Sequence, residues 1–405
     1  MRTFKIIFVL MTITSLLFCQ SLKKEVESWY EGKTVKWEKS LEDLFNFDIV
    51  VAKGSKDFVI AQIDKNNLAK VEYYNSEGDL LWKKEISKVT GIEKLLNVKI
   101  RISDSGNSVM IFWTGDHELV ICQIFTKSGD LLYTSKVQPV IVESIDISLD
   151  GKYTNFFRPI GTLDGEIIKL KFPYEISKRA HIVTKIVDNG KIVVDVDDRS
   201  TLFHSSGIQF WMLYDINKNE IIKHSVMEIC KNDKFYICAI NNYFFVKDKL
   251  TNTTTLYDNR GNAIWGKNDF SLLEHGFDRS NYFFDKSNMK LYYLKRNILY
   301  CYKLNDGEKI WERPINEEEL KISRNISVTL KENKLFISKY FYKSISKPPW
   351  NIPSNFITQI WKLDEIGNGV ETIKDKVHII PSRVTLTEQK NIKFYSGKGG
   401  YYEND

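Results

Sequence analysis

The residues best suited to chemistry in this sequence form two short acidic groups. One is the Asp-His-Glu segment at 116–118, and the other consists of Asp195, Asp197 and Asp198. Carboxylate oxygens are calcium ligands, but the second group lacks the glycine and the downstream glutamate of a calcium-binding loop. The first group lies in a predicted hairpin turn, where polar residues are ordinary. The sequence therefore predicts no metal site and no catalytic residue.

Other catalytic signatures do not occur in the sequence. The six histidines are scattered, without a His-x-His or His-Glu-x-x-His pair, and there is no Gly-x-Ser-x-Gly elbow, P-loop or dinucleotide fingerprint. Four cysteines form no Cys-x-x-Cys pair, and we expect buried free thiols at Cys122, Cys230, Cys238 and Cys301. The sequence predicts no cofactor and favours a binding protein over an enzyme.

Composition and charge indicate a folded protein with a mixed surface. The chain of 405 residues is 43% hydrophobic and 27% charged, with a formal net charge of +6. Lysine and glutamate are interspersed from end to end, whereas nucleic-acid-binding proteins concentrate their basic residues on one face or helix. We therefore expect a solvated surface and no nucleic-acid partner.

The first twenty residues have the pattern of an export signal. Two basic residues, at positions 2 and 5, precede an uncharged run at 6–18 that is too short to cross a bilayer as a helix. Cys19 follows directly, and the segment 15–20 resembles the lipobox of bacterial lipoproteins, in which the cysteine becomes lipidated. Lipidation of Cys19 would anchor the chain in the cell envelope, in the periplasm or on the cell surface. Cleavage after Ser21 would instead leave a secreted chain.

A short phrase recurs along the rest of the chain, with a turn glycine followed by an aromatic residue four positions later. Glycine permits positive φ in a tight turn. An aromatic at this spacing falls on the outer strand of the repeat, where a flat side chain packs between neighbouring repeats. We therefore interpret these residues as structural. The clear copies are Gly78 and Trp82, Gly129 and Tyr133, Gly261 and Trp265, and Gly307 and Trp311.

Each repeat is predicted to contain four antiparallel strands. In one repeat, alternating runs at 98–103, 109–113, 119–125 and 131–133 are separated by turn residues. Four further copies of the phrase are degenerate, and they lie near Trp37, Gly165, Asn217 and Trp361. Four-stranded units at such spacing are typical of β-propeller blades.

The two ends of the chain complete this prediction. Residues 34–40 supply an outer strand with no blade before it, and residues 378–396 supply two strands with no closing strand after them. Pairing the two ends would close a ring and remove exposed sheet edges. We favour a single all-β propeller over residues 34–396 with eight blades, and seven blades remain the alternative. Residues 1–19 would be the signal, 20–33 a tether, and 397–405 a tail.

The repeat resembles known propeller families. The Gly-x-x-x-Trp closures resemble the PQQ-like repeat, and the turn at 147–152 resembles the Ser-x-Asp-Gly-Lys turn of WD40-like bacterial propellers. With its export signal and length, the chain is similar to propeller lipoproteins of the cell envelope. A quinone-dependent dehydrogenase of this kind would imply a longer chain with a vicinal cysteine pair, and no adjacent cysteines occur. The resemblance therefore disfavours that enzyme.

One insertion interrupts the repeats and marks a candidate contact surface. The proline-rich segment 340–356 breaks the strand pattern. Its aromatics, Tyr340, Tyr342 and Trp350, are of a type enriched at protein interfaces. We expect a non-catalytic, exported propeller, monomeric and tethered only by its lipid, that acts as a protein-binding scaffold. The alternative is a propeller enzyme or small-ligand-binding protein that uses the central channel.

Overall fold

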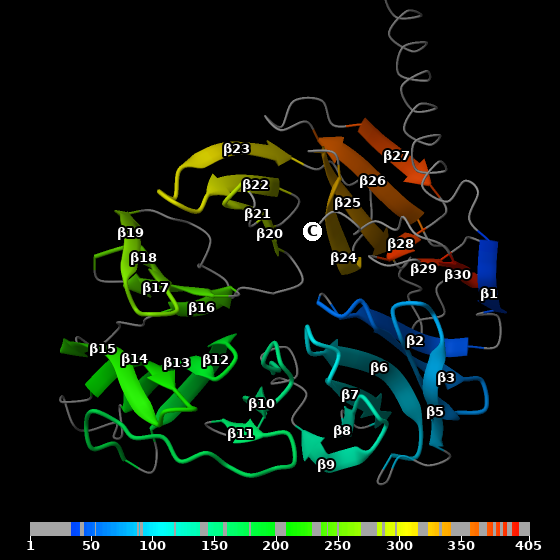
Figure 1. The fold of residues 1–405 in the computed structure, drawn as a ribbon, viewed down its shortest axis with the longest axis horizontal. Coiled ribbons are helices and arrows are strands. Elements are labelled where there is room, and N and C mark those ends of the chain that lie inside the picture. Colours follow the sequence, from blue (N-terminus) through cyan, green and yellow to red (C-terminus); the bar gives the residue numbers. More distant parts are fainter. Residues whose placement is uncertain are drawn as a thin grey trace, which may run out of the picture.

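Short antiparallel strands make up the computed structural model (Figure 1). The structure describes residues 34–396 except for 41–43, 53, 87–88, 90–91, 117–118, 138–144, 157–159, 178–179, 199–207, 229–235, 241, 249–250, 269–281, 286–287, 296–297, 315–322, 332–333, 342–356, 364–370, 376–377, 381–383 and 387–390. We name the sheets A to H in their order around the ring, and in sheet H the structure describes the backbone alone.

The first four sheets begin at the N-terminal strand. Sheet A consists of β28 (His378–Ile380), β29 (Val384–Leu386), β30 (Asn391–Ser396) and β1 (Thr34–Ser40). Sheet B consists of β2 (Leu44–Val51), β3 (Phe58–Asp64), β4 (Ala69–Tyr74) and β5 (Leu80–Ile86). Sheet C consists of β6 (Leu95–Ile102), β7 (Ser108–Gly115), β8 (Val120–Thr126) and β9 (Leu131–Val137). Sheet D contains only β10 (Tyr153–Thr154) and β11 (Gly161–Thr162).

The other four sheets follow the same plan. Sheet E consists of β12 (His181–Asp188), β13 (Lys191–Asp198), β14 (Ile208–Asp215) and β15 (Glu220–Glu228). Sheet F consists of β16 (Tyr236–Ile240), β17 (Tyr243–Asp248), β18 (Thr253–Asp258) and β19 (Ala263–Asn268). Sheet G consists of β20 (Tyr282–Asp285), β21 (Lys290–Lys295), β22 (Ile298–Lys303) and β23 (Lys309–Pro314). Sheet H consists of β24 (Ser323–Lys331), β25 (Lys334–Phe341), β26 (Ile357–Leu363) and β27 (Glu371–Asp375).

The sheets confirm the predicted all-β propeller with four-stranded antiparallel units. In Figure 1 they stand around a common centre. In sheets B to H the first strand is innermost and the last is outermost, whereas in sheet A β28 is innermost and β1 is outermost. Among the described residues, seven sheets have four strands and sheet D has two. The number of blades, eight or seven, stays a prediction, because it depends on whether sheet D counts as a blade.

Both ends of the described chain contribute to sheet A. Strand β1 pairs with β30, with Thr34 opposite Ser396 and Ser40 opposite Asn391. This pairing is consistent with the predicted closure of a ring. The C-terminal region supplies three strands to the sheet rather than the predicted two, because a short strand, β28, precedes the two predicted ones.

Sheet D is a much reduced unit. Its two strands have two residues each, and single bridges flank them, from Ile147 to Thr154 and from Gly161 to Ile167. Four segments thus follow the order of a four-stranded meander, but each contributes only one or two paired residues. The residues that follow, 168–176, belong to no sheet, and the chain bends at 173–174. This segment is called the strap below.

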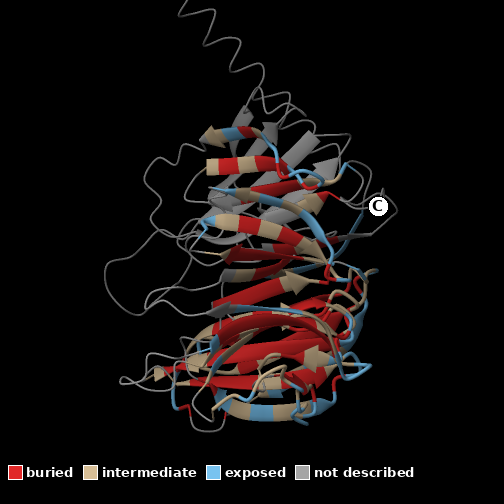
Figure 2. Cartoon of the chain, turned by 90° about the vertical axis from the view of Figure 1, so that its left-hand side faces the viewer, coloured by how far each residue is buried: buried red, intermediate tan, exposed pale blue. Residues whose placement is uncertain are grey.

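Among the residues whose burial the structure describes, the core lies between neighbouring sheets. Apolar clusters join sheet B to sheet C, for example through Val71 and Trp113, and join sheet E to sheet F through Leu213 and Phe244. Figure 2 shows buried residues running through the strands in successive layers. In the part of the chain that the structure describes, no helix is long and apolar enough to cross a membrane.

Candidate functional site

Three of the repeated aromatic residues, on sheets A, B and F, donate a hydrogen bond to the turn of the next sheet. Trp82 on the outer strand β5 donates a hydrogen bond from Nε1 to the carbonyl of Lys127 in sheet C, at 2.9 Å. Its ring covers Gly129, where an added Cβ would lie 2.9 Å from Cγ of Trp82. Tyr73 and Phe125 pack against the same ring, with centroids at 5.5 and 5.7 Å. Gly129 is therefore needed both for its φ of 90° and for the space that its missing side chain leaves.

Two other tryptophans make the same contact between their own sheet and the next one. We call the boundary between two neighbouring sheets a seam. Trp265 on β19 donates to the carbonyl of Leu304 at 2.7 Å and lies over Gly307. Trp37 on β1 donates to the carbonyl of Gly78 at 2.9 Å, across the seam between sheets A and B. Each bond satisfies an indole N–H that is partly buried.

Sheet E keeps the contact with a lysine in place of the aromatic. Asn219 takes the turn position with a φ of 55°, and Lys223 stands four residues later on β15. The Lys223 ammonium donates to the carbonyl of Gly261 at 2.7 Å and lies 4.9 Å from the centroid of the Tyr257 ring. Lys223 also covers Gly261, whose added Cβ would lie 3.1 Å from its Cβ. Lys223 was not predicted from the sequence, although its spacing of four residues from Asn219 is the signal that identifies it.

The remaining copies of the phrase differ from one another. Tyr133 on β9 packs edge-on against Phe156 near sheet D, with centroids 6.0 Å apart. Trp311 on β23 is buried beside Tyr292. Trp361 lies on β26, the third strand of sheet H, and thus before the last strand of its sheet.

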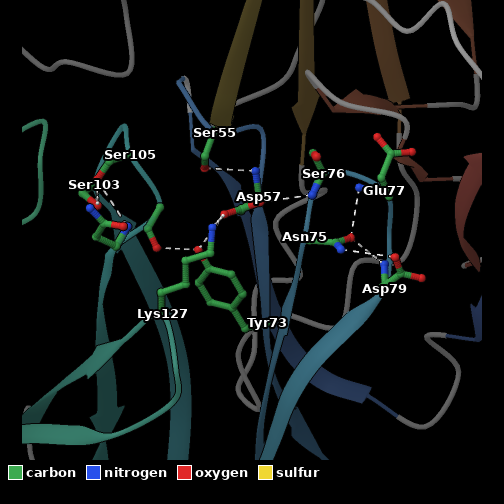
Figure 3. Close-up of polar contacts among 12 residues, drawn as sticks. Ser55, Asp57, Tyr73, Asn75, Ser76, Glu77, Asp79, Ser103, Ser105 and Lys127 are labelled. Carbon is green, nitrogen blue, oxygen red and sulfur yellow. Dashed lines mark hydrogen bonds and ion pairs between the residues drawn. The ribbon is translucent and has the colours of Figure 1, made fainter.

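A buried carboxylate joins sheets B and C beside the Trp82 contact (Figure 3). Asp57, in the turn before β3, is 3% exposed. Its Oδ2 accepts hydrogen bonds from the Lys127 ammonium at 2.6 Å and from the Tyr73 hydroxyl at 3.3 Å. Its Oδ1 accepts one from the Ser76 amide at 3.1 Å. Figure 3 shows Lys127, from the turn after β8, and Tyr73, on β4, reaching Asp57, so one carboxylate links sheets B and C.

The electrostatics of this network favour a neutral Tyr73. Burial raises the pKa of the Tyr73 hydroxyl far above its ordinary value, and the charge of Asp57 and the hydrogen bond to it add to this effect. The phenol therefore keeps its single proton, for which the Gly106 carbonyl in sheet C competes with Asp57. Lys127 balances the carboxylate while its own side chain stays 44% exposed. The network thus reaches from the core to the surface.

A shallow groove opens at the surface end of this network. It has a volume of about 530 Å³ and is lined by Leu81, Trp82, Asn107, Thr126, Lys127 and Ser128. Leu80 and Leu131, on the outer strands of sheets B and C, are 50% and 51% exposed, and Leu81 is 44% exposed. We call the groove together with these leucines the B–C rim. It combines exposed aliphatic side chains with one cation and several hydroxyl and amide groups.

The acidic groups considered in the sequence do not converge on a common point. Asp195 and Asp197 share one face of β13, whereas Asp198 lies on the other face and accepts hydrogen bonds from Ser177. Asp116 lies in the turn after β7, and 117–118 are outside the described residues. No group of three potential metal ligands occurs within the described part of the chain.

The cysteines are as expected where the structure describes them. Cys122, Cys238 and Cys301 are free and buried. Burial raises the pKa of the Cys301 thiol to about 12 and raises that of Cys122 further. These thiols are therefore protonated at neutral pH and are poor nucleophiles.

Several predicted residues fall outside the described part of the chain. Cys19, Tyr342 and Trp350 are among them, as are the segments 1–33 and 397–405. Tyr340 lies within strand β25, opposite Arg324 and Thr358. The segment between β25 and β26 therefore starts after Phe341, two residues later than the predicted loop 340–356.

Comparisons with known proteins add similarities of shape. No family model and no curated protein matches the sequence. Among solved structures, the chain is similar to the C-terminal WD40 domain of Sif2, at 11% identity and a TM-score of 0.47, covering 90% of this chain and 100% of that one. It is also similar to BamB from Moraxella catarrhalis, at 10% identity and a TM-score of 0.44, with 90% and 100% covered. A eukaryotic initiation factor follows at 11% identity and a TM-score of 0.40, with 86% and 89% covered.

Proposed function

We propose that this chain is a non-catalytic β-propeller that binds another protein in the cell envelope, where a lipid on Cys19 tethers it after export. The observation that carries the binding role is the B–C rim. Leu81 is exposed in the groove beside Trp82, and Leu80 and Leu131 are exposed on the outer strands of the same two sheets. Isolated exposed apolar residues are ordinary, but clustered ones with a polar rim are typical of interaction sites.

The polar part of the rim supports a protein rather than a purely apolar partner. Thr126 and Ser128 hydroxyls bond to each other at 2.7 Å, and the Ser128 hydroxyl donates to Asp130 at 2.6 Å. Lys127 is held by Asp57, so its position costs little entropy to fix on binding. A rigid apolar patch with fixed polar neighbours is the arrangement that stable interfaces use.

The test of the scaffold compares two charged substitutions on the rim with a matched one elsewhere. The purified full chain is immobilised and exposed to an envelope extract, and we expect one protein to be retained in stoichiometric amount. The double variant Leu81→Asp/Leu131→Asp should lose it. Ile264→Asp should retain it, because Ile264 stands at the position of Leu81 in sheet F and is similarly exposed, at 36%. Equal capture by the wild type and the double variant would refute the role of the rim.

The tether is tested separately by metabolic labelling with a radioactive fatty acid. We expect label on the wild-type chain and none on Cys19→Ala. Label that persists in the variant would refute lipidation at this residue. If the extract yields no partner and a small molecule instead raises the melting temperature, the alternative of a ligand site in the central channel gains support.

A further inference from the structure

The strap compensates for the small size of sheet D. Sheet E presents full-length strands toward its neighbour, but sheet D offers strands of only two residues. The strap lies against the same apolar cluster that contains Ile160, Val194 and Phe210. In Figure 1 it runs from β11 along the side of sheet E. It therefore occupies space that the outer strands of a full sheet D would fill.

Side chains along the strap alternate as they do in a strand. Five apolar residues at every second position are half-buried against sheet E, and these are Ile168, Leu170, Phe172, Tyr174 and Ile176. The intervening Lys169, Lys171 and Glu175 are exposed. Edge-on ring contacts hold one end of the strap, where the Tyr174 ring centroid lies 5.3 Å from that of Phe210 and 5.9 Å from that of His224. One face of an extended segment is thus buried and the other faces solvent.

The side chains of the strap alternate as in a β-strand, but its backbone does not form the hydrogen bonds of a paired strand. Ile168 donates to the carbonyl of Ile160 at 3.0 Å, and Ser177 donates to Asp198 at 2.7 Å. Between these ends, the Lys171 amide reaches the Tyr214 hydroxyl at 3.4 Å. No backbone-to-backbone bond joins 169–176 to any other residue that the structure describes. Apart from the Lys171 amide, the amides and carbonyls of 169–172 have no hydrogen-bond partner among the described residues, and the alternating burial of their side chains indicates an extended backbone before a bend at 173–174.

A pre-extended segment with unpaired backbone groups is the receptor for an added strand. Main-chain hydrogen bonds supply the affinity in such pairing, and alternate side chains supply the specificity. The strap is held at both ends and along one face, so little ordering entropy remains to be lost. Pro173 has no N–H, which limits a continuous ladder to the residues before it.

The exposed side chains next to this backbone indicate the charge of the occupant. Along the outward row, Ile167 is 56% exposed and is followed by the exposed Lys169 and Lys171. Opposite charges across paired strands stabilise the pairing, whereas like charges directly opposite each other oppose it. An apolar residue opposite Ile167 and acidic residues opposite the lysines would complement this row.

We propose that the strap, together with Ile167 before it, is a docking site for an extended acidic segment of a partner protein, which pairs with residues 167–172 as an added β-strand. This deepens the proposed function by naming a second surface and the chemistry of its ligand. It does not depend on the B–C rim, and purified components test it. Failure here therefore leaves the capture experiment on the rim unaffected.

The test uses the purified full chain and a short fluorescent peptide of alternating glutamate and valine. We expect saturable binding, read by anisotropy, which a peptide of alternating lysine and valine does not show. The same acidic peptide N-methylated at alternate amides, on the edge that would pair, should bind at least about tenfold more weakly. Equal binding by the methylated peptide would overturn the added strand, and so would the absence of any binding by the acidic peptide.

Two variants and one exchange measurement complete the test. Lys169→Glu/Lys171→Glu should weaken binding by at least about tenfold, whereas Lys152→Glu, which changes an exposed lysine in the turn before β10, should not. Hydrogen exchange should show that the peptide protects the amides of 169–172 in the wild type. Unchanged affinity in the double variant, or protection confined to other segments, would overturn the proposal.

Discussion

The seam between sheets B and C and the seam between sheets E and F solve one packing problem with different side chains. At the first, the Trp82 indole covers Gly129 and donates to a carbonyl in the next turn. At the second, the Lys223 stem covers Gly261 and its ammonium donates to the Gly261 carbonyl. The two side chains stand at the same position of the repeat, four residues after a turn residue with positive φ.

The difference shows what the repeated position requires. It needs a long side chain that covers the next glycine and carries a donor at its tip, and aromatic character is only one way to meet that need. Lysine meets it with a flexible stem and a charge, and Tyr257 replaces part of the lost aromatic packing. The tryptophan seam should be more rigid and more sensitive to substitution, and the predictions below test that ranking.

Removal of the covering side chain should have the largest effect. Trp82→Ala deletes the ring between Tyr73 and Phe125 and leaves a void over Gly129. We expect a loss of about 3–4 kcal/mol in the free energy of unfolding. Lys223→Ala should cost about half as much. Urea unfolding of both variants measures the difference, and equal losses would contradict the ranking of the seams.

Substitution of the turn glycine by alanine should also destabilise the B–C seam more than the E–F seam. Both glycines have positive φ, of 90° at Gly129 and 82° at Gly261, so alanine costs about 1 kcal/mol at either position. At Gly129 the new Cβ also comes within 2.9 Å of a ring held on both sides, whereas at Gly261 its nearest contacts are Cβ and Cδ of Lys223, at 3.1 and 3.2 Å. We expect Gly129→Ala to lose about 1 kcal/mol more than Gly261→Ala. Melting temperatures of the two variants check this, and the reverse order would refute the rigidity argument.

These two seams also show how far the sequence alone predicts the molecule. Turn glycines and alternating apolar runs act locally, so the strands of sheets B and C could be predicted from residues next to one another. Lys223 could not be assigned by residue type, because its role depends on Gly261 and Tyr257 in another sheet.

Two further features lay beyond sequence reasoning for a related reason. Asp57 meets Lys127 only across a seam, from 70 positions away. The strap packs where sheet D has strands of only two residues, and no local sequence pattern predicts that these strands are so short. In both cases the partner residues are set by tertiary packing.

A smaller change isolates the charge at the E–F seam. Lys223→Met keeps the stem over Gly261 but removes the ammonium that bonds to its carbonyl and faces the Tyr257 ring. We expect a loss of about 1 kcal/mol. The control is Lys218→Met, because Lys218 is 69% exposed and pairs with Glu220 on the surface at 3.6 Å; it should change stability by less than about 0.5 kcal/mol. If the two variants lose the same free energy of unfolding, the Lys223 ammonium does not take the role that the indole N–H has at the tryptophan seams.

The smallest effect is expected from the pH dependence of the B–C seam. Burial, and then the charge of Asp57, raises the pKa of Tyr73 in the folded chain above its unfolded value of about 10. The unfolded chain therefore releases this proton first, so the stabilisation is complete below about pH 10 and is lost as the pH rises further. At about pH 10.5 the loss from one such tyrosine is slightly less than 1 kcal/mol. Burial and the charge of Glu72 raise the pKa of Tyr74 in the same direction, so the informative quantity is the difference between the wild type and Tyr73→Phe. Urea unfolding at pH 8 and 10.5 should show a shallower decline for the variant, because it no longer carries the shifted phenol. Parallel declines would mean that the Tyr73 proton does not contribute to holding sheet B against sheet C.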